Sequence, residues 1–536
     1  MTHAEAPPVH GQATRSWKDT LAPFVAALLV LAASFSNFLS YHDYPFLRAE
    51  VAMVAGWFVP MAAVFAAAHL WSSNFGRALL DGLLVFLAID LNSDYTLVAV
   101  GVAGAAALLR LSRNVSLLEP LTIIALVVLG SSLAGLTERK PAIATVAGDR
   151  QQPVNDRPAI LHLILDEHGG PGGASDPIFK RKLVDFYTGH GFRLFERAYS
   201  RHFHTVNAIP DVLNFGHPGE SKNVSETLDI GRTTYLSALE KQGYRLNFYQ
   251  SDFADFCRYH RFSTCTSAWS PSMSFLKDRQ VTVAEKARLL ALKFTALSSG
   301  AVATANLLDL ATRIPVLRPL DLPVLAPTQR AVSNTLGGLA TLERMTSDLK
   351  SAQPGNVYFA HVLAPHYPYL TKADCSLIRP SDWGYRRSAR SIASREAAYR
   401  EQVACVTAHV DKLIRAFDAS PAGKNGVIVI HGDHGSRITR IEPADWNREK
   451  IEASDLMAGY STLFAVRAPG IEPGIDRTPY ASPAILKRLA ESRFSSLDGL
   501  KPGPGRVYLD GPNWTVGSPI SIADAWPEPN LTVSQP

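Results

Sequence analysis

Acidic and imidazole side chains follow two short apolar runs that lie far apart in the chain. One run ends directly before Asp166 and Glu167, and the other ends three residues before Asp433 and His434. Apolar runs of this length, followed by acids and glycines, are typical of buried parallel strands, and ligand sites of open α/β sheets gather at the carboxyl ends of such strands. Asp and Gly are also ordinary turn residues, but two such motifs favour a site over turn chemistry. Carboxylate oxygens together with imidazole are suitable ligands for Zn²⁺ or Mn²⁺.

A third apolar run, 357–362, leads into His366, and helical stretches such as 233–242 lie between the runs. Strands that alternate with helices predict an α/β domain with a mostly parallel sheet and helices on both faces. Three strand ends rich in Asp, Glu and His strengthen the prediction of a metal site.

The first 140 or so residues are dense in Ala, Leu and Val. A helix needs roughly 20 apolar residues to cross a bilayer. The stretch between Arg77 and Arg110 contains Asp90 and Asp94, which are costly at the bilayer centre and natural in a surface turn. We therefore interpret that stretch as two short helices. The five predicted transmembrane helices cover about 20–40, 51–71, 77–91, 95–109 and 117–136.

Lysine and arginine predict the orientation of these helices. With five helices and an internal N-terminus, the positive loops all fall on the inner side, as the positive-inside rule requires. Arg48 is the one exception. Everything after residue 136 then lies outside, so we expect a multi-pass protein of a bacterial inner membrane with a periplasmic catalytic domain. The positive residues are Arg15, Lys18, Arg77, Arg110 and Arg113.

Four cysteines lie in the second part of the chain and none in the apolar part. An even number confined to one region suggests disulfides and an oxidising compartment. Three connectivities are possible; we favour Cys257–Cys265 and Cys375–Cys405, and the alternative is four buried free thiols. Four membrane helices would leave these cysteines in a reducing cytoplasm, so the count of five and the disulfides support each other.

These features predict a transmembrane helical domain at 1–136, a linker at 137–157 and a catalytic domain at 158–536. The segment 285–313 carries leucines among basic residues. It is interpreted either as a helix on the membrane surface or as an ordinary core-facing helix. The formal net charge of +5 is spread without long basic runs, so no nucleic-acid partner is expected. The apolar helices contain few charges, which favours an anchor over a transporter.

Three sequence motifs resemble the alkaline phosphatase superfamily. They are the strand ending in Leu165-Asp166-Glu167, the later Gly432-Asp433-His434-Gly435, and the middle Pro365-His366-Tyr367-Pro368-Tyr369. The nearer branch is the sulfatase-like one, which includes lipoteichoic acid synthase and the phosphoethanolamine transferases. The resemblance covers about residues 158 to 500. Those transferases carry five membrane helices before an outer catalytic domain, which the predicted membrane part fits.

The resemblance implies one divalent metal, Zn²⁺ or Mn²⁺, bound by an acid of the first strand and by Asp433 and His434. The apolar run aligns Asp166 with that acid, and Glu167 remains an alternative because a slip of one residue exchanges them. A nucleophile is expected at the start of a helix some tens of residues later. Thr205, five residues before a proline, resembles the family's threonine, both as nucleophile and as metal ligand.

Alternatives to these roles stay open. Ser200 is a second candidate nucleophile, and Thr205 is otherwise a simple helix cap. A helix start suits a phosphate oxygen, because its backbone N–H groups point outward. His366 is expected to contact the phosphoryl group or to protonate a leaving group. Further candidate histidines are His204, His361 and His431.

The expected activity is transfer of phosphoethanolamine or phosphoglycerol from a phospholipid donor to a cell-envelope glycan or lipid. No cysteine begins the Cys-x-Pro-x-Arg pattern of formylglycine sulfatases, which argues against that class. Two rival readings are a hydrolase of phosphate or sulfate esters at the same site, and a non-catalytic envelope-assembly protein. The apparent presence of the metal residues favours an enzyme.

Overall fold

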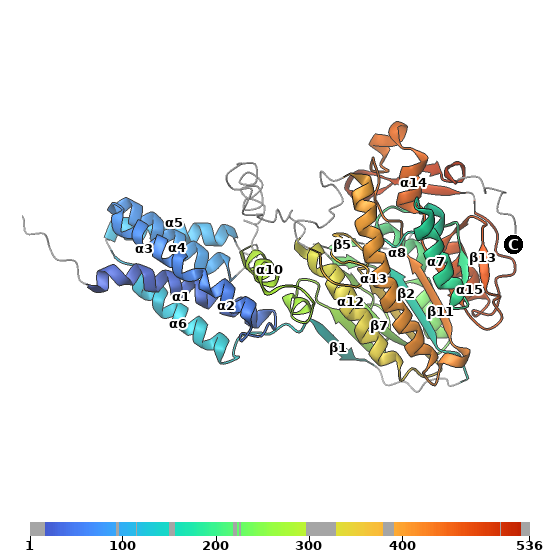
Figure 1. The fold of residues 1–536 in the computed structure, drawn as a ribbon, viewed down its shortest axis with the longest axis horizontal. Coiled ribbons are helices and arrows are strands. Elements are labelled where there is room, and N and C mark those ends of the chain that lie inside the picture. The colour runs from blue at the N-terminus through green and yellow to red at the C-terminus, as the bar shows by residue number, and fades with distance from the viewer. Residues whose placement is uncertain are drawn as a thin grey trace, which may run out of the picture. The chain divides into compact units, whose positions relative to one another are not determined.

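A computed structural model describes residues 17–92, 96–113, 115–148, 156–217, 222–224, 227–295, 329–378, 391–503 and 505–526. The chain divides into two compact units (Figure 1). The first comprises Met1–Lys140 with Thr282–Pro327, and the second comprises Pro141–Val281 with Thr328–Pro536.

The first unit is a bundle of apolar helices. Helix α1 packs against α3 and α6, and α4 packs against α5. Small side chains such as Ala26 and Ala62 are fully buried where these helices meet, beside Leu84 and Leu121. The described helices are α1 (Trp17–Tyr41), α2 (Ala49–Gly56), α3 (Phe58–Trp71), α4 (Asn74–Asp90), α5 (Thr96–Arg113), α6 (Leu118–Leu133) and α10 (Val283–Thr295).

All five apolar stretches predicted to cross the membrane are helical, but only two described segments are long and apolar enough to do so. These are Thr20–Tyr41 and Ala49–Trp71, near the N-terminus. Helices α4 and α6 have 17 and 16 residues. At 1.5 Å per residue each spans about 25 Å, which is less than the ~30 Å hydrocarbon core. The described residues therefore contain two candidate spans and not the five that the sequence predicted, so the five-helix topology stays a prediction.

The second unit is built on a mixed, mostly parallel sheet with the strand order β1-β9-β7-β10-β2-β11-β12-β3-β13. The five strands from β9 to β11 are parallel to one another, and β1 and β12 run antiparallel to their inner neighbours. The predicted α/β class is confirmed. The strands are β1 (Ile143–Ala147), β2 (Ile160–Leu165), β3 (Arg193–Phe195), β7 (Arg245–Ser251), β9 (Thr264–Ala268), β10 (Asn356–Val362), β11 (Val427–Gly432), β12 (Phe464–Arg467) and β13 (Gly474–Asp476).

Helices cover both faces of this sheet, because successive residues of each strand point to opposite sides. Ile160 and Ile164 belong to one apolar layer, with side chains of α8, α9 and α15. Leu161 and Leu163 belong to the other, with side chains of α12 and α13. The helices are α7 (Pro177–Gly189), α8 (Thr205–Leu213), α9 (Thr234–Lys241), α12 (Gln329–Leu349), α13 (Ile392–Asp418), α14 (Ala453–Tyr460) and α15 (Ser482–Glu491).

The predicted domain boundaries need two corrections. The range 137–157, predicted as a linker, contains the edge strand β1, whose backbone pairs with β9 from Ile143↔Ala268 to Ala147↔Thr264. Helix α10 falls within the predicted catalytic range 158–536 but belongs to the first unit. The ring of its Phe294 lies 5.1 Å from that of Phe35 in α1. The core-facing interpretation of this helix therefore holds for its described residues; residues 296–313 lie outside them.

Both predicted disulfides are present, Cys257–Cys265 and Cys375–Cys405. Cys265 lies in β9, and Cys405 lies in α13, where it is fully buried. The second disulfide ties the loop after β10 to α13. No cysteine of the chain is free.

Candidate active site

The carboxyl ends of three central strands that are far apart in sequence, β2, β10 and β11, lie side by side. β2 lies between β10 and β11, and its last residue, Leu165, pairs with Val362 on one side and with Gly432 on the other. The chain segments that follow carry Asp166 and Asp433. Parallel pairing with this register explains why the predicted motifs meet.

Asp166 and Asp433 are almost completely buried and lie beside His361, and one potential ligand atom of each falls within 4.8 Å of the others. The Oδ1 atom of Asp433 accepts hydrogen bonds from the backbone N–H groups of Glu167 (3.1 Å) and His434 (2.8 Å). Among the described residues, neither Asp433 Oδ2 nor Asp166 Oδ1 has a hydrogen-bond partner. Buried acceptors without partners are costly, so this pair of carboxylates fits a cation.

The pKa values of the Asp166 and Asp433 carboxyl groups are shifted in opposite directions from their ordinary values. Burial, followed by the charge of Asp433, raises the pKa of Asp166 well above its ordinary value. Burial also opposes the ionisation of Asp433, but His434 and His361 hold its pKa below the ordinary value. Without a cation, the ionised form of Asp433 therefore disfavours ionisation of its neighbour.

His434 directs an unprotonated ring nitrogen at these groups. Its Nδ1 lies 2.9 Å from the carbonyl oxygen of Gly435, and since a carbonyl only accepts, Nδ1 carries the proton. Burial lowers the pKa of His434 to about 3, so the ring is neutral at pH 7 and Nε2 holds a lone pair. Nε2 lies 3.2 Å from Asp433 Oδ2 and 3.7 Å from Asp166 Oδ1. A lone pair and two carboxylates that converge in this way are typical metal ligands.

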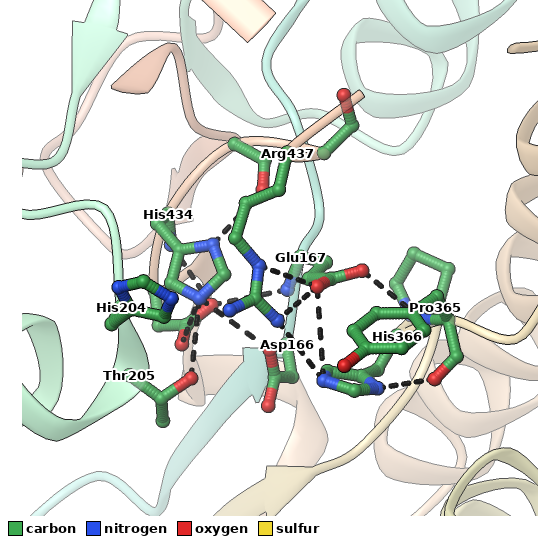
Figure 2. A network of polar contacts seen from close by, with 12 residues as sticks. Asp166, Glu167, His204, Thr205, Pro365, His366, His434 and Arg437 are labelled. Carbon is green, nitrogen blue, oxygen red and sulfur yellow. Dashed lines mark hydrogen bonds and ion pairs between the residues drawn. The ribbon is translucent and has the colours of Figure 1, made fainter. Parts of the chain in front are cut away.

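Thr205 is the first residue of α8, as predicted. His204 before it has extended backbone angles (φ −120°, ψ 143°) and starts the helix without a side-chain cap. The Thr205 hydroxyl lies 3.1 Å from His434 Nε2 (Figure 2). The backbone N–H groups of the first turn and the positive end of the helix dipole lie beside this hydroxyl. The hydroxyl of Ser200, the alternative nucleophile, instead donates to the carbonyl of His202 at 3.0 Å.

Glu167 faces different partners from those of Asp166. Its backbone has a positive φ of 62°. Its Oε1 accepts from Nε of Arg437 at 2.5 Å, and Nη2 of the same guanidinium also donates to it. Its Oε2 accepts from the backbone N–H of Tyr367 at 3.0 Å. The structure thus places Asp166 with the metal-type cluster and Glu167 with an arginine, so it favours Asp166 among the two acids that the sequence left open.

His366 lies on the arginine side of the site (Figure 2). Its Nδ1–H donates to the carbonyl of Tyr367 (2.5 Å), and its Nε2 accepts from Nη2 of Arg437 (3.0 Å). Burial lowers the pKa of His366. In this arrangement both ring nitrogens have hydrogen-bond partners, and Nε2 holds Arg437 in place. Its direct catalytic role stays a prediction.

Arg437 was missed as a site residue in the sequence, although it lies only three residues after His434 in the same glycine-rich loop. It is buried, and although burial lowers its pKa, Glu167 raises it above the ordinary value of arginine. Its positive φ of 55° sets it apart from its neighbours. A guanidinium held in the same site as the Thr205 hydroxyl (Figure 2) suits an anionic group.

The other histidines named from the sequence take different places. His361 belongs to the carboxylate cluster, and neither of its ring nitrogens has a hydrogen-bond partner within the described part of the chain. His431 lies beneath the site, where its Nε2 contacts Nε2 of His162 at 2.9 Å. His204 Nδ1 pairs with Asp510 at 2.6 Å. Only His361 is therefore added to the predicted metal set.

Comparison with known proteins identifies structural neighbours only. No family model and no curated protein matches the chain. The C-terminal periplasmic domain of EcEptC from Escherichia coli, in complex with Zn, is 12% identical, with 68% of this chain and 88% of that chain covered and a TM-score of 0.36. BT1596, a 2-O GAG sulfatase, is 13% identical (66% and 77% covered, TM-score 0.39). The phosphonate monoester hydrolase of Agrobacterium radiobacter is 12% identical (66% and 80% covered, TM-score 0.39).

Proposed function

We propose that this chain is a membrane-anchored, metal-dependent transferase. It moves phosphoethanolamine or phosphoglycerol from a phospholipid to a hydroxyl of a cell-envelope glycan or lipid, outside the cytoplasmic membrane. One observation carries the proposal: the Thr205 hydroxyl stands at a helix N-terminus, 3.1 Å from a neutral histidine nitrogen. Two buried carboxylates converge on that same nitrogen.

Asp166, Asp433, His434 and Thr205 would hold one Zn²⁺ or Mn²⁺, with His361 beside them. When bound, the cation lowers the pKa of the threonine hydroxyl and compensates the carboxylate charges. The fit rests on the buried oxygens of Asp166 and Asp433 that lack hydrogen-bond partners among the described residues. Glu167 is assigned to Arg437 and not to the metal.

The protein side chains carry the two transfers. In the first, the Thr205 hydroxyl gives its proton to solvent and its oxygen bonds to phosphorus, while the bond between phosphorus and the diacylglycerol oxygen breaks and that oxygen takes a proton from solvent. In the second, the acceptor hydroxyl gives its proton to solvent and its oxygen bonds to phosphorus, while the bond between phosphorus and the Thr205 oxygen breaks and Thr205 takes a proton back. The N–H groups at the start of α8 bind the phosphoryl oxygens. Arg437, held by Glu167 and His366, supplies a fixed positive charge.

The membrane part supports a lipid donor. Two apolar segments, Thr20–Tyr41 and Ala49–Trp71, have the length and composition of membrane spans. Two disulfides in the second unit suit an oxidising compartment outside the cytoplasm. A phospholipid is available to an enzyme anchored in the same bilayer, and an envelope acceptor is available on its outer side.

Diacylglycerol release tests the proposal. Purified full-length protein is supplied with mixed bacterial phospholipids and Zn²⁺ or Mn²⁺, beside the variant Thr205→Ala. We expect release by the wild type alone, and the lipid consumed identifies the head group. Cleavage of generic phosphate or sulfate esters without diacylglycerol release would favour the hydrolase. No turnover of either substrate class would favour a binding protein, despite the retained site residues.

A further inference from the structure

A second group of charged side chains, mostly positive, lies at the amino-terminal ends of the central strands. The Thr205 site lies at the opposite, carboxyl-terminal ends of these strands. Two cavities open at the amino-terminal ends, with volumes of about 290 Å³ and 540 Å³. Arg245, the first residue of β7, lines the smaller one, and Val427, the first residue of β11, lines the larger one. A six-residue strand at about 3.3 Å per residue separates its two ends by roughly 20 Å. Both cavities are therefore distinct from the candidate active site.

The smaller cavity has an excess of positive charge. Arg232, Lys241, Arg245 and Arg261 line it, against the single acid Glu240. Glu240 already binds Arg232 and the buried His260. The Arg245 guanidinium donates to the Ser263 hydroxyl, at 3.0 Å from Nε and 2.5 Å from Nη2, and a hydroxyl does not neutralise it.

Two of these cations are available to a ligand. Lys241 and Arg261 are exposed, and neither forms an ion pair with any residue in the described ranges of the chain. Tyr244 and Phe262 add aromatic surface to the same cavity. Positive charge beside an aromatic wall suits an anionic sugar, because its anionic groups bind the cations and its sugar rings pack against the aromatic side chains.

The larger cavity continues this surface. Arg157, Lys424 and Arg493 line it, and its one acid is Asp156. The Arg157 guanidinium lies 5.7 Å from the ring centre of Tyr244, so this contact joins the walls of the two cavities. We define the basic face by the positively charged residues that line the two cavities, without Arg232, which is paired with Glu240: Arg157, Lys241, Arg245, Arg261, Lys424 and Arg493.

We propose that the basic face binds an anionic glycan, with phosphate or sulfate groups against its arginines and sugar rings in the two cavities. The charge and the hollow shape select this partner over a membrane surface. A surface that inserts into lipid exposes large apolar side chains. The large exposed apolar residues described in the second unit, such as Ile178, Trp446 and Trp514, line neither cavity. This binding does not depend on the proposed reaction.

Charge reversal tests the basic face in the full-length protein, held in nanodiscs of zwitterionic lipid. The probe is fluorescein-labelled dextran sulfate, with neutral dextran of equal length as its control, measured by fluorescence anisotropy at fixed ionic strength. The test variant is Lys241→Glu with Arg261→Glu. The matched control is Arg181→Glu with Lys182→Glu, which reverses one arginine and one lysine at exposed positions of α7. Thermal unfolding and turnover of a small soluble ester serve as checks on folding.

We expect the test variant to bind dextran sulfate at least tenfold more weakly than the wild type, while the control variant changes affinity less than threefold. Equal weakening by both variants would show an effect of net charge and overturn the proposal. Unchanged binding by the test variant would overturn it too. Vesicles of anionic phospholipid form a separate arm: loss of vesicle binding with dextran sulfate binding intact would assign the face to a membrane. Full displacement of the probe by inorganic phosphate at matched ionic strength would show that the basic face binds a single anion and not a glycan, and would overturn the proposal.

Discussion

The carboxylate of Glu167 is bound by the guanidinium of Arg437, 270 residues further along the chain, inside the protein. Both side chains are buried, and the same arginine donates to His366. The pair joins the loop after β2 to the loop after β11. It therefore fixes the position of both motifs that supply the carboxylates of the site.

Removal of one partner of this pair is expected to destabilise the second unit. Glu167→Gln leaves the buried Arg437 charge without its bonded carboxylate, which costs about 3–5 kcal/mol in the free energy of unfolding. Glu167→Gln with Arg437→Met removes both charges and is expected to cost less than the single change. Urea unfolding of the full-length protein, followed by tryptophan fluorescence, measures both. A double variant that is less stable than the single one would contradict the role of the pair.

Thr205→Ala is expected to reduce diacylglycerol release at least about 10³-fold, because the oxygen that bonds to phosphorus is lost. Thr205→Ser keeps that oxygen and is expected to retain measurable turnover. Initial rates of lipid consumption give both values. A wild-type rate in Thr205→Ala would show that another residue is the nucleophile. Ser200→Ala is the matched control, and we expect it to remain active.

The contribution of the Asp166 carboxyl group to the stability of the metal-free protein is expected to fall as the pH rises. Burial and Asp433 raise the folded-state pKa of Asp166, so the contribution of this group is fully present below its ordinary pKa of about 4 and is lost as the pH passes its folded-state value. Zn²⁺ or Mn²⁺ at neutral pH is expected to reverse the loss, by about 2.7 kcal/mol at a hundredfold excess over Kd. Melting curves of the wild type and of Asp166→Asn in chelator across pH 4–8, repeated with metal, measure this as a difference. The difference is needed because burial lowers the pKa values of histidines such as His361 and His434, and these groups shift stability in the opposite direction.

Asp166→Asn provides the matched variant for that experiment. Without metal it removes the buried like-charge contact with Asp433. We therefore expect each kcal/mol of stability gained to raise the melting temperature above that of the wild type by about 1–2 °C. It also removes a proposed ligand, so the metal-induced increase and the activity are expected to disappear. An unchanged response to metal would argue against Asp166 as a ligand.

The two disulfides are expected to contribute unequally. Their sequence separations are 30 residues for Cys375–Cys405 and 8 residues for Cys257–Cys265. Loop-closure entropy predicts about 3.6 kcal/mol for the first and about 2.5 kcal/mol for the second. Paired Cys→Ser variants compared by urea unfolding give the order. Equal losses would show that chain entropy does not dominate.

The sequence by itself determined the elements that carry the chemistry. Apolar runs that end in acids identified β2 and β11, because a strand buried on both faces is predominantly apolar and the acids of the site follow it at its carboxyl end. The helix start at Thr205 was an equally local feature, and the even number of cysteines predicted disulfides, with three pairings possible and one favoured. The five apolar stretches were identified as helices, but their lengths in the structure support only two candidate spans.

Only the tertiary structure decided which neighbours share a site. Asp166 and Glu167 are adjacent in the chain and alike in chemistry, and one turns to His434 while the other turns to Arg437. The strand order β10-β2-β11 brings His361 into the cluster and Arg437 across from it. Likewise β1 and α10 find their partners far along the chain. Such contacts depend on which strands pair and in which register, and these are set by the packing of the whole sheet rather than by any local run of residues.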